Sequence, residues 1–338
     1  MNGARPALLI TFGALLLAFS VSVAVTIGPA DITPAEVWRS VAARLGWGGS
    51  PLSELREGIV WNLRMPRTLL AAVCGAGLAL CGVVMQSLLR NPLADPFVLG
   101  VSSGASTGAV AVIVLGWGAG VVSLSAGAFV GALLSFAMVL LLSHSLGGGM
   151  DRVVLSGVAA MQLFSALTSF TVLTSADAET TRGVLFWLLG SLSGAGWSDV
   201  LLCAAVLCLV LVVCLASTTT LDAFAFGEEA AANLGVRVGR ARVLLLSVTA
   251  LLTAVLVSSA GAIGFVGLVL PHAARALTGS AHARLLPVTA MAGAVFLVWV
   301  DTVARTALDP QEIPVGVVTS LIGVPAFVAV LYRSRRKS

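Results

Sequence analysis

Charged residues are scarce in this chain, because Asp, Glu, Lys and Arg make up only 10% of its 338 residues, while apolar residues make up 58%. A soluble globular protein carries about 25% charged residues, so the composition excludes that class. Lysine is nearly absent, and its one example is Lys337 near the C-terminus. A P-loop needs a lysine directly after its glycines, so the chain cannot bind ATP in that way.

Cysteine and histidine are also few and form no recognisable site. The five cysteines fall inside apolar segments without a C-x-x-C spacing, which is typical of small core residues and not of a disulfide or zinc site. The histidines, His144, His272 and His282, are scattered along the chain. We therefore expect no metal site and no cofactor.

Long apolar segments dominate the chain instead. A helix of about 20 apolar residues spans the hydrocarbon core of a bilayer. We predict ten such segments, at residues 8–27, 66–89, 97–115, 121–142, 153–174, 200–216, 241–260, 263–278, 284–304 and 314–332. The first is too long for the apolar region of a signal peptide, about 7 to 15 residues, so we expect it to be retained. The prediction is an all-α polytopic membrane protein with one transmembrane domain over residues 1–338.

The distribution of basic residues predicts the orientation. With the N-terminus inside, the inner segments hold twelve Lys and Arg residues and the outer segments hold seven. The positive-inside rule then favours cytoplasmic N- and C-termini. The protein would be a multi-pass protein of the plasma or inner membrane, in contact with lipid and without a nucleic-acid partner.

Most predicted spans contain no Asp, Glu, Lys or Arg, as in residues 97–142 and 243–271. Ion-coupled transporters keep such groups in the membrane to carry the coupling ion, so an ion-coupled secondary transporter is the weaker alternative. A membrane enzyme would show clustered catalytic side chains, and none are evident. The 36 glycines are explained by close helix packing or by a smooth, weakly polar transport pathway.

The longest predicted inner loop contains a short helical segment between Gly227 and Gly235. It is too short and too polar to span the membrane, and glycine is a natural helix terminator. It is either a solvated loop helix or a surface helix that offers Ala230, Ala231 and Leu234 to a groove on a partner.

Several motifs together resemble one permease family. Residues Glu229 to Gly235 fit the EAAxxxG pattern of the coupling helix in ABC importer permeases. The segments RMPRTLLA, RNPLADPFVLG, GFVGLVLPHAAR, VDTVAR and EIPVGVVTSLIGVPAF, in this order from Arg64 onward, resemble the iron-siderophore, haem and cobalamin permeases of the FecCD type. The chain departs from the family at Ala262, where a proline is common, and at Ala281, where an aspartate is common.

The resemblance implies a type II ABC importer permease that is not itself an enzyme. Its partners would be two ATP-hydrolysing subunits, a second permease subunit, identical or paralogous, and an extracytoplasmic substrate-binding protein. The implied substrate is a ferric siderophore, with haem and cobalamin as alternatives. The coupling helix would occupy about residues 227–236 and includes Gly227, Glu228, Glu229, Ala230, Ala231, Leu234 and Gly235.

The resemblance also assigns roles at three further places. In the family's cobalamin importers, arginines matching Arg64, Arg67 and Arg305 receive acidic residues of the binding protein, and the other interpretation is snorkelling to lipid phosphate. The turn containing Arg90, Asn91, Pro92, Asp95 and Pro96 is either a rigid helix connection, because proline prevents helix continuation, or an inner-face element beside the coupling helix. A possible outer gate comprises Phe186, Trp187 and Leu188.

Overall fold

The computed structural model describes residues 4–47, 52–114, 123–175, 178–308 and 310–335, and the regular secondary structure in this part of the chain is helical apart from one isolated β-bridge. Each of the ten predicted segments overlaps a helix. These helices are α1 (Ala4–Thr26), α4 (Met65–Leu88), α5 (Val101–Val114), α6 (Leu124–Ser145), α7 (Met150–Ser175), α9 (Trp197–Ala216), α12 (Val238–Ala260), α13 (Val266–Thr278), α14 (His282–Thr306) and α15 (Val315–Arg335). The predicted all-α membrane fold is confirmed, and seven of the described helices are long and apolar enough to cross a membrane by themselves.

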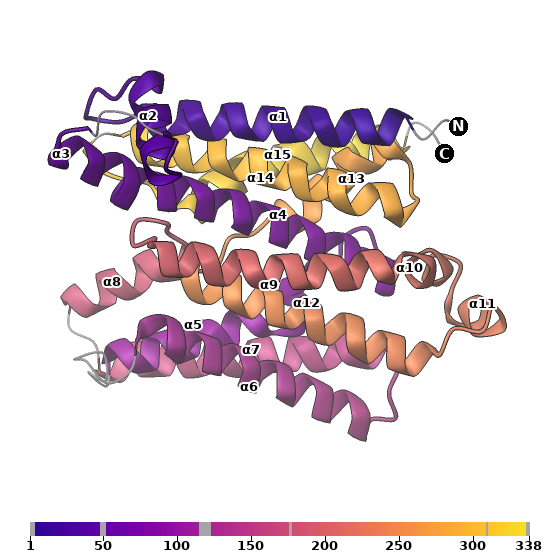
Figure 1. Cartoon of the computed structure of the whole chain (residues 1–338). Helices are drawn as coiled ribbons and strands as arrows, with labels where there is room; N and C mark the ends of the chain where they lie inside the picture. Colours follow the sequence, from indigo (N-terminus) through magenta and orange to yellow (C-terminus); the bar gives the residue numbers. More distant parts are fainter. Residues whose placement is uncertain (1–3, 48–51, 115–122, 176–177, 309, 336–338) are drawn as a thin grey trace.

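The remaining helical elements lie at the two ends of the bundle or connect its helices. They are α2 (Pro34–Arg44), α3 (Glu54–Glu57), the π-helical η1 (Gly58–Arg64), the 3-10 helix η2 (Pro96–Leu99), α8 (Ala178–Leu188), α10 (Thr218–Phe224) and α11 (Glu228–Asn233). Figure 1 shows α2, α3 and α8 at one end, here called the α8 end. The helices α10 and α11 lie at the opposite end, here called the α11 end, where α1 also begins and α15 finishes.

Helix α4 is the central element, and nearly all of its residues are buried. It packs against α14, α13, α12 and α9, and in Figure 1 it runs between α14 and α9. Glycines allow this close packing: a Cβ atom on Gly82 would lie 1.9 Å from the carbonyl oxygen of Gly267 on α13, and one on Gly75 would lie 2.1 Å from that of Gly293 on α14. At these two crossings, glycine brings the helix backbones together.

The predicted start of the second span, at residue 66, was too late. Helix α4 continues backward through η1 and α3 as one rod from Glu54 to Leu88. Pro66 lies in the first turn of α4 and has no backbone N–H, so it cannot make an ordinary helical hydrogen bond. The π-helical register of η1 carries the helix past this position.

The predicted third and eighth spans are shorter helices than expected. Helix α5 has 14 residues and α13 has 13 residues, so each is about 20 Å long, against a hydrocarbon core of about 30 Å. Helix α5 follows η2 and Gly100, which has φ 72°, and α13 follows Phe265, which has φ 67°. Because these irregular segments pack inside the protein, their free backbone groups are kept from lipid.

Helix α2 begins with a capping box. The side chain of Glu36 accepts hydrogen bonds from the backbone N–H of Thr33 at 2.8 Å and from its hydroxyl at 2.9 Å, and the backbone N–H of Glu36 bonds to that hydroxyl at 3.3 Å. These hydrogen bonds, together with Arg56, lower the pKa of Glu36 to about 2. The reciprocal bonds satisfy backbone donors at the start of the helix.

Candidate functional site at the two ends of the bundle

Helix α11 lies within the predicted coupling segment. Gly227 before it has φ 105° and Gly235 after it has φ 84°, values that glycine adopts without strain. The side chain of Leu234 is 70% exposed, as expected for a residue offered to a partner. Ala231 instead points into the protein and is fully buried, so it anchors α11 and is not offered to a partner.

A cleft of about 780 Å³ separates α11 from its neighbours at the α11 end. Its lining includes Glu228, Glu229 and Asn233 of α11, together with Arg90 and Asp151. Phe226, just before α11, also lines the cleft and is 76% exposed. Its apolar neighbours in the sequence did not predict this exposure.

The structure places the proline-containing turn beside α11. A Cβ atom on Gly227 would lie 3.3 Å from Nη1 of Arg90. The side chain of Asn91 accepts a hydrogen bond from the backbone N–H of Leu93 at 2.9 Å, and that of Asp95 accepts one from Phe97 at 2.9 Å. Pro92 is exposed in this turn, and Pro96 begins η2. These local bonds give the turn a fixed shape against which α11 lies.

Two polar links join α11 and α10 to the bundle. Glu228 of α11 forms an ion pair with Arg242 of α12. On α10, Asp222 accepts hydrogen bonds from the backbone N–H of His282 at 3.0 Å and lies 2.6 Å from its Nδ1. Nε2 of the same histidine lies 2.5 Å from the hydroxyl of Ser87 on α4. No sequence signal joins these last three residues, because they lie 60 and 195 positions from one another.

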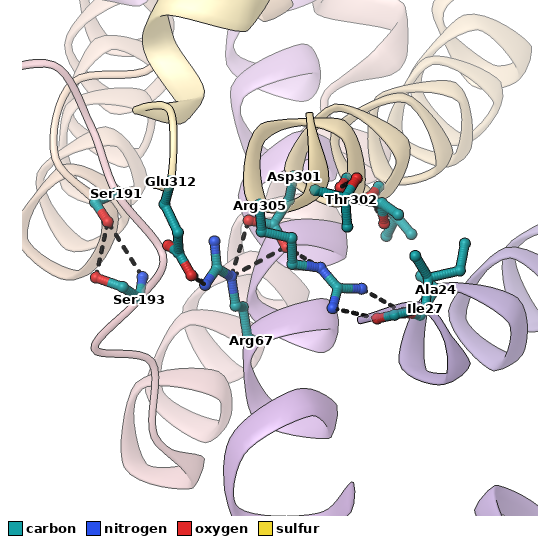
Figure 2. A network of polar contacts seen from close by, with 11 residues as sticks. Ala24, Ile27, Arg67, Ser191, Ser193, Asp301, Thr302, Arg305 and Glu312 are labelled. Carbon is teal, nitrogen blue, oxygen red and sulfur yellow. Dashed lines mark hydrogen bonds and ion pairs between the residues drawn. The ribbon is translucent and has the colours of Figure 1, made fainter. Parts of the chain in front are cut away.

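At the α8 end, Arg67 is held by two carboxylates. Its Nε lies 3.0 and 3.2 Å from the oxygens of Asp301, and its Nη1 lies 2.8 and 3.0 Å from those of Glu312. Figure 2 shows Arg67 between these two residues. The side chain of Asp301 is 2% exposed and that of Glu312 is 36% exposed. Charge-assisted hydrogen bonds from two different nitrogens to two carboxylates fix the guanidinium group in orientation.

The other two arginines bind the last carbonyl groups of α1 and the segment that follows. Arg305 donates to Ile27 at 2.7 Å and to Ala24 (Figure 2). Arg64 donates to Val25 at 3.0 Å, and its other contacts include a further carbonyl at 2.9 Å. A cation at a helix C-terminus is favourable, because the unpaired carbonyl groups carry partial negative charge.

The structure therefore brings the three predicted docking arginines together, but none of them is free. All three line one cavity of about 330 Å³ that opens at the α8 end, and Glu312 lines it with them. Their positive charges exceed the negative charges of Asp301 and Glu312 by one. The motif pattern did not indicate either acid as a partner, because these residues lie 234 and 245 positions from Arg67.

The predicted gate residues, Phe186, Trp187 and Leu188, form the last turn of α8. The segment that follows is joined to the start of α15: the N–H of Val315 bonds to the carbonyl of Gly190 at 2.9 Å, and that of Gly316 bonds to Leu189 at 3.1 Å. The end of α8 and the start of α15 are therefore mechanically linked. Among the described residues, no group of three or more His, Cys, Asp or Glu side chains is placed to hold a metal ion.

The model of the FecCD transport family matches residues 15–333. The chain belongs to this family. The permease is 44% identical over 292 residues to the cobalamin import system permease protein of Halobacterium salinarum, covering 86% of this chain and 77% of that protein. It is 35% identical over 343 residues to the hemin transport system permease protein of Yersinia pestis, covering 100% of this chain and 99% of that protein.

A solved structure gives the same result for the fold. It is described as an inward-facing conformation of a putative metal-chelate type ABC transporter, and it matches with a TM-score of 0.84 and 31% identity over 96% of this chain and 98% of that one. The family resemblance seen in the motifs is thus confirmed. The protein is a multi-pass membrane permease of an ABC importer, without catalytic activity of its own, and its class works with separate ATPase and binding-protein partners. This membership replaces the ion-coupled alternative.

Proposed function

We propose that this FecCD permease moves a metal chelate across the membrane by alternating access, as one of two permease subunits above two ATPase subunits and below a substrate-binding protein. The observation that carries the proposal is α11, a short helix beside a cleft at one end of the bundle, with the exposed Leu234 at its C-cap. A surface helix with an exposed apolar side chain fits a groove on a partner. ATP-driven closure of the ATPase pair would push on α11 and rock the bundle.

The substrate class is proposed from two kinds of support. The family resemblance implied a ferric siderophore, whereas the named relatives import cobalamin and hemin. All three are metal chelates, and the 44% identity to a cobalamin permease makes cobalamin the first ligand to test. The test is uptake by proteoliposomes that contain the full importer, with ferric siderophores, haem and cobalamin compared at equal concentration.

The coupling role of α11 is tested on the importer purified from its native membrane through a tag on this chain. We expect an ATPase subunit to co-purify with the wild-type chain. The Leu234→Ser and Glu229→Ala variants should lose that subunit or lose stimulated ATP hydrolysis. Leu277→Ser is the matched control, because Leu277 is 69% exposed and lies on α13. Equal behaviour of Leu234→Ser and Leu277→Ser would refute the coupling role.

We propose that the arginine cluster at the α8 end, formed by Arg64, Arg67 and Arg305, receives acidic residues of the binding protein. Its cavity and its excess positive charge support this, because opposed charges steer association and arginine pairs with carboxylates. Arg67→Glu should weaken binding of the co-purified binding protein by tenfold or more. Arg39→Glu, on α2 at the same end, is the control for net charge. Unchanged stimulation of ATP hydrolysis in Arg67→Glu would exclude docking at this site.

The same proposal sets the orientation, with the α11 end and both termini in the cytoplasm and the α8 end outside. A reporter fused after the last residue of the chain, active only in the cytoplasm, tests it directly. An inactive fusion, together with activity of a second reporter that works only outside the cytoplasm and is fused at the same position, would reverse the assignment of the two ends.

A further inference from the structure

Arg67 has one part of its guanidinium group still available. Its Nε bonds to Asp301 and its Nη1 bonds to both oxygens of Glu312. Among the described residues, Nη2 has no hydrogen-bond partner. An arginine binds an incoming carboxylate most strongly when two of its nitrogens engage both oxygens. For an acid that enters from the cavity, those two nitrogens are Nη1 and Nη2, and Glu312 occupies Nη1.

The two acids that hold Arg67 differ in how readily they can leave. Asp301 lies inside α14, its side chain is 2% exposed, and it is also 3.8 Å from Nε of Arg305. Removing it would leave buried positive charge without a partner, which is costly. Glu312 lies in the connection between α14 and α15, and its side chain is 36% exposed. Glu312 is far more exposed than Asp301, and ion pairs near solvent are weaker than buried ones, so Glu312 is the partner that can be exchanged.

We propose that Glu312 is an internal substitute for the carboxylate of the binding protein: it occupies Arg67 while the permease is undocked, and it is displaced when an acidic side chain enters the cavity. The inference rests on the proposed docking at the arginine cluster. Glu312 then lowers the affinity of that cluster for any acidic partner, so that only a partner with a well-placed carboxylate displaces it.

The exchange of carboxylates at Arg67 also affects the segment that follows the proposed gate. Glu312 stands three residues before Val315, whose N–H bonds to the carbonyl of Gly190 just after α8. Ile313 directly follows Glu312 in the chain, and its N–H bonds to the carbonyl of Ala304 on α14 at 2.9 Å. Release of Glu312 therefore removes its side-chain contact from a short connection whose backbone is bonded on one side to α14 and on the other to the segment after α8.

The first test uses the purified chain alone and needs no partner. The arginine reagent p-hydroxyphenylglyoxal attacks the two η nitrogens of a guanidinium group, and mass spectrometry measures its addition at Arg67. We expect Glu312→Gln and Glu312→Ala to raise the rate of labelling at Arg67 several-fold. Asp31→Asn removes an exposed acid at the same end and should leave the rate unchanged. An unchanged rate in both Glu312 variants would overturn the proposal.

The second test measures binding of the binding protein that co-purifies with the wild-type chain, using the importer in lipid nanodiscs. Glu312→Gln should tighten binding by roughly threefold to tenfold at low salt, with a smaller gain at high salt. Asp31→Asn again serves as the control. Equal or weaker binding by Glu312→Gln, with binding still lost in Arg67→Gln, would overturn the exchange and leave docking intact. Wild-type binding that does not depend on Arg67 would instead refute the docking proposal itself.

Discussion

The close approach of α4 to α13 at Gly82 gives the sharpest test of the packing. A Cβ atom at this position would lie 1.9 Å from the carbonyl oxygen of Gly267 and 2.5 Å from its carbonyl carbon. Ordinary contact begins near 3.4 Å, so Gly82→Ala must move the two backbones apart by about 1.5 Å. Overpacking of this kind costs about 1 to 3 kcal/mol. The higher helix propensity of alanine offsets at most about 1 kcal/mol of this cost.

We therefore expect Gly82→Ala to lower the free energy of unfolding by about 2 kcal/mol, and Gly82→Val to lower it further. The assay is reversible unfolding in mixed micelles with increasing sodium dodecyl sulfate. Gly239→Ala on α12 is the matched control, because no atom lies within 4 Å of its Cβ position. If Gly82→Ala unfolds at the same detergent fraction as Gly239→Ala, the close approach of α4 and α13 is refuted.

Three further predictions concern polar contacts. Asp301→Ala should cost about 3 kcal/mol in the same unfolding assay, and less in an Arg67→Ala background; additive losses would contradict the pairing. His282→Ala should cost about 1 to 3 kcal/mol, whereas Asp222→Asn, which keeps an oxygen acceptor, should cost under half as much; equal losses would argue against the hydrogen-bond chain. Because hydrogen bonds lower the pKa of Glu36 to about 2, its contribution to α2 is complete above about pH 4.5 and is lost as the pH falls toward 2. Amide-exchange protection of α2 should follow this pH course in the wild type. In Glu36→Ala, the contribution of Glu36 to that protection should be absent at every pH.

The hydrophobic pattern alone predicted the helices of the bundle, because a chain in lipid must satisfy its backbone groups within each helix. The glycines around α11 were equally readable, since glycine adopts without strain the positive φ values at which this short helix begins and ends. The pattern failed where local chemistry competes with periodicity. The second span was predicted to begin at residue 66, but the π-helical turn of η1 extends the helix back to Glu54.

The sequence by itself determined the class of protein and the places of its apolar helices along the chain. Only the tertiary structure decided what those residues contact. Arg67 meets Asp301 and Glu312 because α4, α14 and the connection to α15 converge at the α8 end, and Ala231 turns inward because α11 packs against the bundle. Such contacts join residues more than 200 positions apart, so they are set by helix packing and not by any local pattern in the chain.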